Sequence, residues 1–122
     1  MARITALGGV FFRSPDPQAL AAWYRDKLGF SIEDWGGALI SAQGKGPPHG
    51  VWAPFDNNTN YFKPSSREFM INFAVDDLDG FLAALEANGV EVKGRQQMDG
   101  MGKFAWILDP DGTKIELWEP EE

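Results

Sequence analysis

The chain has 122 residues, which is the size of a single domain that can bury a proper core. Eleven Lys and Arg against 18 Asp and Glu give a net charge of −7, which argues against nucleic acid and against an anionic membrane surface as partners. The sequence has no cysteine and one histidine, His49, which excludes disulfides, thiolate metal sites and multi-histidine metal motifs.

The first predicted helix follows a short strand at Val10-Phe11-Phe12. Asp16-Pro17 supplies an N-cap and a proline at the first helical position. The helix carries one apolar stripe at helical spacing, made of Leu20, Trp23, Tyr24 and Leu28. Gly29 ends the helix, and Phe30-Ser31-Ile32 predicts the next strand.

The centre of the chain is predicted to be mostly loop. Residues 43–68 hold four of the eight prolines, and residues 37–40 and 50–53 are weaker strand candidates. This stretch also carries more aromatic side chains than a solvated linker would, namely Trp52, Phe55, Tyr61 and Phe62. We therefore expect it to fold back over a cleft or against a partner chain.

The second half repeats the order of the first. A strand over residues 70–75 precedes an N-cap at Asp76 or Asp77, and Asn88-Gly89 ends the helix. The apolar stripe of this helix is Leu78, Phe81, Leu82 and Leu85. Val90-Glu91-Val92 predicts a further strand.

A hairpin closes the chain. Residues 104–108 and 113–118 are predicted strands, and the Asp-Pro-Asp-Gly turn at residues 109–112 joins them. Asp16 to Gly29 and Asp76 to Gly89 span the same 13 positions, which supports an internal duplication. The predicted fold class is α+β, with two βαβββ modules whose strands form a cupped mixed sheet around a cleft and whose helices cover the outer face. Module 1 is expected over about 5–55, the connecting loop over 43–68 and module 2 over 69–120.

Three motifs resemble those of the vicinal oxygen chelate superfamily, which includes glyoxalase I, bleomycin-resistance proteins and extradiol dioxygenases. They are Trp23-Tyr24 followed by residues 28–30, the Val-Asp-Asp-Leu of residues 75–78, and the hairpin turn at 109–112 leading into residues 114–118. The resemblance extends from about Gly8 to Pro120. It implies the same paired-module fold, a ligand cavity, and a homodimer in which a second chain helps to complete the cleft.

The resemblance also implies where a metal would bind. Enzymatic members hold one divalent metal with four inward-facing side chains, mostly His and Glu. Those positions fall on or beside Gly9, in the strand through Val51 and Trp52, on Met70 and on Glu116. Only Glu116 is a metal ligand of the right chemistry, so we expect no tightly bound metal and no other cofactor. If a divalent metal does bind, Glu116 and His49 are the candidate ligands.

Glu116 is the candidate catalytic residue. Strand alternation places it on the face opposite Ile115 and Leu117, and we expect it to point into the cleft. A carboxylate in a partly apolar cavity has a raised pKa and can act as a general acid or base. The alternative is a structural hydrogen-bond acceptor. His49 is either a base or a metal ligand, or an exposed loop histidine.

Other candidate ligand-binding residues lie on the predicted strands. Asn72 shares a strand face with Met70 and either orients a ligand carbonyl or amide or forms an internal hydrogen bond. Arg13 lies four residues after Gly9, the spacing at which glutathione-using relatives carry a carboxylate-binding arginine; the alternative is a surface ion pair. Three tryptophans form either an aromatic cage for a flat or cationic ligand or part of the core: Trp52, Trp106 and Trp118.

These features favour a protein that binds a small organic molecule in an aromatic-lined cleft without a tightly bound metal. One alternative is a lyase or isomerase in which Glu116 is the general base and Asn72 or Arg13 stabilises an enolate. Another is a metal-dependent glyoxalase or dioxygenase with a degenerate site. With no signal-peptide pattern and no apolar run of about 18 residues, the expected location is the cytoplasm.

Overall fold

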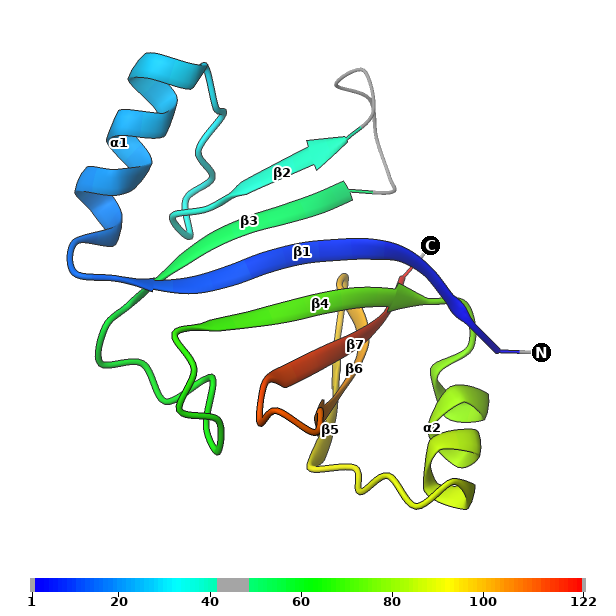
Figure 1. Cartoon of the computed structure of the whole chain (residues 1–122). Coiled ribbons are helices and arrows are strands. Elements are labelled where there is room, and N and C mark those ends of the chain that lie inside the picture. The colour runs from blue at the N-terminus through cyan, green and yellow to red at the C-terminus, as the bar shows by residue number, and fades with distance from the viewer. Residues whose placement is uncertain (1, 42–48, 122) are drawn as a thin grey trace.

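A computed structural model describes residues 2–41 and 49–121. Its elements, in chain order, are β1 (Ile4–Ser14), α1 (Pro17–Leu28), β2 (Ala38–Ser41), β3 (His49–Asp56), β4 (Phe69–Val75), α2 (Leu78–Ala87), β5 (Gly94–Met98), β6 (Gly102–Leu108) and β7 (Lys114–Pro120). The strands form one mixed sheet in the order β2-β3-β1-β4-β7-β6-β5 (Figure 1). This architecture confirms the predicted α+β class. Neither described helix is long and apolar enough to cross a membrane.

The first half of the chain builds one end of the sheet. β1 pairs in parallel with β3, and β3 pairs antiparallel with β2. As predicted, Asp16 caps α1 by accepting a hydrogen bond from the Ala19 backbone N–H at 3.0 Å, and Gly29 ends the helix with a φ of 76°. The strand predicted at Phe30-Ser31-Ile32 is wrong. Phe30 and Ile32 instead pack in the cluster under α1, and no strand forms at residues 30–32.

The second half builds the other end. β4 pairs in parallel with β7, followed outward by β6 and β5. Asp77 is the N-cap of α2 and accepts from the Gly80 N–H at 3.1 Å. With Asp77 as the cap, α2 has 10 residues and α1 has 12, so the duplication does not preserve helix length. The strand predicted at residues 90–92 is also wrong, because Val90 and Val92 pack against the α2 cluster and pairing begins at Gly94.

The two faces of the sheet have different roles. Alternate residues of β3, β4 and β7 pack under the helices on what we call the outer face, including Trp52 under α1 and Leu117 under α2. The opposite, inner face carries a third cluster of buried residues: Phe11, Ala53, Phe62 and Met70. Phe62 does not belong to a strand, so part of the segment between β3 and β4 folds against the inner face, as the central aromatic residues predicted.

Candidate functional site

Glu116 lies on the inner face of the sheet and is 1% exposed. Its neighbours on β7, Ile115 and Leu117, pack on the α2 side, as strand alternation predicted. The parallel pairing of β4 with β7 sets Asn72 beside Glu116, and the antiparallel pairing of β6 with β7 sets Trp106 on its other side. Three adjacent strands therefore bring these side chains together.

Three neutral side chains donate hydrogen bonds to the Glu116 carboxylate. Tyr61 Oη donates to Oε2 at 2.6 Å, Trp106 Nε1 donates to Oε2 at 3.0 Å, and Asn72 Nδ2 donates to Oε1 at 2.9 Å. Two of the donors come from strands and one, Tyr61, from the segment between β3 and β4. A buried carboxylate needs such partners because it has lost its water.

Lys114 completes what we call the Glu116 network, made of Glu116, Tyr61, Asn72, Trp106 and Lys114. The Lys114 ammonium donates to the Tyr61 backbone carbonyl and lies 5.1 Å from the Tyr61 ring centre and 5.4 Å from the Trp106 ring centre. Burial lowers the pKa of Lys114, and the charge of Glu116 partly opposes that shift. The network therefore holds one acid and one base on the same face of β7.

Gly8 makes room for Asn72. A Cβ atom at Gly8 would lie 2.0 Å from Asn72 Oδ1, so any larger residue would displace the Asn72 amide. Asn72 is 1% exposed, and its Oδ1 accepts no hydrogen bond from the part of the chain that the structure describes. The hydrogen bond from Asn72 Nδ2 to Glu116 therefore requires glycine at position 8, on the neighbouring strand β1.

Burial raises the pKa of Glu116 above its ordinary value of 4.5, and the hydrogen bonds from Tyr61, Trp106 and Asn72 only partly offset this. Burial and the nearby Glu116 charge also raise the pKa of Tyr61. Tyr61 therefore stays a hydrogen-bond donor at neutral pH, and Glu116 is a stronger base than an exposed glutamate.

This pKa shift makes a testable prediction about pH. A carboxyl group whose pKa is higher in the folded state binds protons more tightly when folded, so its contribution to the free energy of unfolding decreases as pH rises from about 4.5 through the raised pKa. Titration of the Glu116 side-chain carboxyl carbon by NMR should give a midpoint above 4.5. Urea unfolding from pH 4 upward should show that Glu116→Gln removes this decrease, and a midpoint at or below the ordinary value would contradict the prediction.

Arg13 forms hydrogen bonds within the chain itself. Its Nη1 donates to the carbonyls of Asn57 at 2.7 Å and Thr59 at 2.9 Å, and its guanidinium carbon lies 5.3 Å from the Phe62 ring centre. Arg13 is thus occupied in holding the segment that carries Tyr61. The spacing from Gly9 did not reveal these partners, and the ligand-binding role of Arg13 stays a prediction.

The three tryptophans do not form one cage. Trp106 and Trp118 lie on the inner face with Phe104 between them, and the Phe104 ring is nearly parallel to both, at centroid distances of 6.4 and 6.0 Å. Trp52 lies on the outer face, with its ring centre 4.3 Å from that of Tyr24 under α1. The expectation that Trp52 joins the other two is therefore wrong, because its neighbours Val51 and Ala53 take the inward positions of β3.

Met70 is fully buried in the inner cluster, where it packs with Phe11, Ala53 and Phe62. His49 begins β3, with its backbone opposite Ser41, rather than lying in a loop. The side chain of His49 lies outside the described residues.

Sequence reasoning missed Tyr61 and Lys114 as site residues. The signals for them were an aromatic residue in a loop and a basic residue two positions before Glu116 on the same strand face.

The residues at the expected metal positions do not fit a divalent ion. A Cβ at Gly9 would lie 2.4 Å from the Val51 carbonyl oxygen, Met70 is enclosed by apolar side chains, and both Glu116 oxygens accept hydrogen bonds. Among the side chains that the structure describes, which do not include that of His49, no group of three or more His, Asp or Glu is placed to hold a metal. Glu116 alone is a weak ligand set for a divalent ion.

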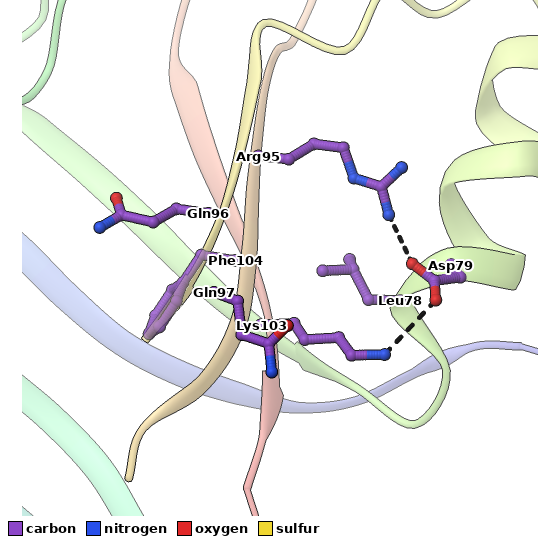
Figure 2. A pocket seen from close by; sticks show the side chains of 7 residues that line it. All are labelled: Leu78, Asp79, Arg95, Gln96, Gln97, Lys103 and Phe104. Atoms are coloured by element: carbon purple, nitrogen blue, oxygen red, sulfur yellow. Dashed lines mark hydrogen bonds and ion pairs between the residues drawn. The ribbon is translucent and has the colours of Figure 1, made fainter. Parts of the chain in front are cut away.

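A separate cavity of about 320 Å³ lies between the start of α2 and strands β5 and β6. Figure 2 shows Arg95 and Lys103 pointing toward Asp79 at the start of α2, with an ion pair from each. Lys103 and then Arg95 lower the pKa of Asp79. These side chains are well exposed to solvent, and exposed ion pairs contribute little to stability, so this cavity has none of the buried polar chemistry of the Glu116 network.

A family profile described as Glyoxalase/Bleomycin resistance protein/Dioxygenase superfamily matches residues 6–117. The chain belongs to this superfamily. The match covers most of both modules and agrees with the resemblance carried by the sequence motifs. A search of curated proteins found no match.

Solved structures of similar fold include enzymes of different activity. Methylmalonyl-CoA epimerase from Mycobacterium tuberculosis is 25% identical with a TM-score of 0.68, and the alignment covers 98% of this chain and 90% of that one. A variant of the Streptomyces coelicolor epimerase in complex with 2-nitronate-propionyl-CoA is 19% identical with a TM-score of 0.70, covering 97% and 96%. The 2,3-dioxygenase LapB from Pseudomonas sp. KL28 is 20% identical with a TM-score of 0.65, covering 98% and 43%. The superfamily fold therefore supports both epimerase and dioxygenase chemistry, and only the residues of the site can distinguish functions for this chain.

Proposed function

We propose that this member of the superfamily binds a small organic molecule on the inner face of the sheet, at Glu116, without a tightly bound metal. The observation that carries the proposal is a buried carboxylate held by three neutral donors, one of which does not belong to the sheet. Trp106 and Asn72 are fixed by strand pairing next to β7, whereas Tyr61 reaches Glu116 from the segment between β3 and β4. A ligand donor can therefore take the place of the Tyr61 hydroxyl without disturbing the sheet.

The surroundings of Glu116 suit an organic ligand. Phe104, Trp106 and Trp118 form a continuous aromatic stack on the inner face beside it. Aromatic side chains supply apolar contact area, while a few placed polar groups orient the bound molecule. The net charge of −7 favours long-range approach of neutral or cationic compounds, so an anionic group on a ligand needs a local cation such as Lys114.

A ligand screen tests this proposal. Metabolites and drug-like compounds would be screened by thermal shift and then by the ¹⁵N–¹H signal of the Trp106 indole, whose N–H donates to Glu116. Ligands are expected to move that signal and to bind Glu116→Gln at least about tenfold more weakly, since hydrogen bonds to a charged group are worth more than neutral ones. The matched control is Glu91→Gln, a change at an exposed glutamate, which should bind normally. Ligands that bind both variants equally would contradict the proposal.

A metal titration tests the second part. Isothermal titration with nickel, zinc and manganese should show no stoichiometric binding in the micromolar range, because one carboxylate that already accepts three hydrogen bonds is a poor ligand set. Metal content of the purified protein, measured by mass spectrometry, provides the independent check. Tight binding that Glu116→Gln abolishes would restore the metal-dependent alternative.

The raised pKa of Glu116 favours a second candidate, an isomerase or lyase that moves a proton next to a carbonyl. Glu116 would take the proton from carbon, the electron pair of the broken C–H bond would pass to the carbonyl oxygen as an enolate, and Glu116 would return the proton to a different carbon of the conjugated enolate as the carbonyl re-forms. The donors that could stabilise the enolate oxygen are Tyr61, Asn72 and Trp106, which donate to Glu116, and Lys114, which donates to the Tyr61 carbonyl. Incorporation of solvent deuterium into methylmalonyl-CoA, absent in Glu116→Gln, would support this candidate.

A further inference from the structure

Tyr61 occupies the Glu116 network in the way that a ligand would. It comes from outside the sheet, yet each part of it meets a complementary group on the inner face. The contacts of Tyr61 therefore describe the molecule that the site is shaped to hold. This argument depends on the proposed binding function and narrows it to a class of compound.

The hydroxyl end is recognised by the carboxylate. Tyr61 Oη donates to Glu116 Oε2 at 2.6 Å, and Trp106 Nε1 holds the same oxygen from the other side at 3.0 Å. Both carboxylate oxygens are in use, so the position of the tyrosine hydroxyl accepts only a group that can donate a hydrogen bond. An ether or a bare ring at this position would leave a buried carboxylate oxygen short of a donor, which is costly.

The ring is recognised by aromatic side chains on three sides. The Tyr61 ring lies parallel to Phe55, with centroids 5.4 Å apart and an interplanar angle of 7°, and edge-on to Trp106 at 6.2 Å and 86°. Phe11 lies 6.4 Å away on the inner face. This arrangement fits a flat six-membered ring better than an aliphatic group of similar volume.

The far end is recognised by Lys114. Its ammonium donates to the Tyr61 backbone carbonyl and also lies over the Tyr61 ring. The carbonyl carbon is the third carbon out from the ring, para to the hydroxyl. A carbonyl or carboxylate oxygen at that distance in a free ligand would meet the same ammonium, and a carboxylate would meet it with full charge complementarity.

We infer that the ligand of this site is a para-substituted phenol whose hydroxyl replaces Tyr61 on Glu116 and whose side chain ends in an oxygen for Lys114. Tyr61 is then an internal competitor that the ligand displaces. Phe62, the next residue, is fully buried and keeps the segment attached to the sheet, while the Tyr61 ring swings away and the Tyr61–Phe62 peptide group turns to release Lys114. Glu116 and Lys114 bind the two ends of the molecule, and the aromatic side chains contact its ring.

The probe that tests this inference is 3-(4-hydroxyphenyl)propanoate, which repeats the atoms of tyrosine from hydroxyl to carbonyl. Its affinity for the wild-type chain would be measured by calorimetry and by the Trp106 indole signal. It is expected to bind at least about tenfold more tightly than 3-phenylpropanoate, which lacks the hydroxyl, and than 4-ethylphenol, which lacks the carboxylate. Lys114→Met should reduce the affinity for the probe by a much larger factor than the affinity for 4-ethylphenol, which loses only the contact of the ammonium with its ring.

Two variants at Tyr61 test the competition. Tyr61→Ala should raise the affinity for the probe about tenfold or more, because the internal competitor is gone. Tyr61→Phe keeps the blocking ring but loses the hydroxyl that Glu116 binds, so it should raise the affinity by a smaller factor. If Tyr61→Ala does not fold, the comparison of the three probes on wild type and Lys114→Met still decides the question.

The possible results separate this inference from the broader proposal. Equal affinity for the probe and its two truncated analogues would overturn the inference. So would compounds of another class that shift the Trp106 signal while phenols do not, and in that case the proposed binding function would stand. If no compound shifts the signal in wild type or in Tyr61→Ala, both the inference and the proposed function fail.

Discussion

Gly8→Ala is expected to destabilise the chain by about 2–4 kcal/mol, because it both overpacks the sheet and breaks a hydrogen bond to a buried carboxylate. The added Cβ would lie 2.0 Å from Asn72 Oδ1, and the displaced amide could no longer donate to Glu116. Urea unfolding would measure the loss. The destabilisation by Gly8→Ala should depend on Asn72, because the atom that the new Cβ would overlap belongs to the Asn72 side chain, which a second substitution can remove.

Asn72→Ala provides the second half of a double-mutant cycle. In that background Gly8→Ala should cost less than about 1 kcal/mol, since the next contact of the new Cβ, with the Ala74 backbone nitrogen, is an ordinary 3.4 Å. Gly9→Ala is the matched control: its Cβ would meet the Val51 backbone carbonyl oxygen at 2.4 Å, so trimming Asn72 should not relieve it. Equal costs of Gly8→Ala with and without the Asn72 side chain would contradict this account.

Phe62→Ala is expected to cost about 3–5 kcal/mol of unfolding free energy, the range for deleting a fully buried aromatic side chain. Phe62 is 0% exposed and fills the inner face against Phe11, Ala53 and Met70. Its loss would leave an apolar void and release the segment that carries Tyr61. The measurement is again urea unfolding, read by tryptophan fluorescence and by circular dichroism.

Phe69→Ala is the matched control for Phe62, since it removes the same side chain from a position that is 39% exposed. Phe69→Ala should lower the free energy of unfolding clearly less than Phe62→Ala, because removing a partly exposed ring leaves little cavity behind. If the two variants lost the same stability, Phe62 would not be the anchor of the inner face. A change in the slope of the unfolding curve for Phe62→Ala alone would indicate that the segment had detached before global unfolding.

The sequence predicted best those features that local chemistry decides. Helix caps and stops depend on a few neighbouring residues, and for this reason Asp16 and Gly29 were identified correctly and Asp77 was one of the two residues expected to cap α2. The strands predicted at residues 30–32 and 90–92 failed because a strand also needs a partner, and these apolar residues pack under helices instead. Apolar content alone does not distinguish the two outcomes.

The site was harder to predict because it depends on register between distant strands. Alternation along β7 was enough to orient Glu116, but the pairing of Asn72 with Glu116 joins positions 44 residues apart. A shift of one residue changes the face, which is why Trp52 could be grouped with Trp106 although the two lie on opposite sides of the sheet. The hydrogen bond from Tyr61 to Glu116 joins residues 55 positions apart, and no local sequence pattern predicts it.

The open order of the sheet also affects how the chain behaves in concentrated solution. In the described part of the chain, β2 pairs only with β3 and β5 pairs only with β6, so each end of the sheet presents unsatisfied backbone amides and carbonyls. β5 carries the charged Arg95 and polar glutamines, which discourage strand addition, whereas β2 carries the exposed aliphatic side chains of Leu39 and Ile40. The two ends are therefore unequally protected, and the β2 end is the one at which a foreign strand would add with less resistance.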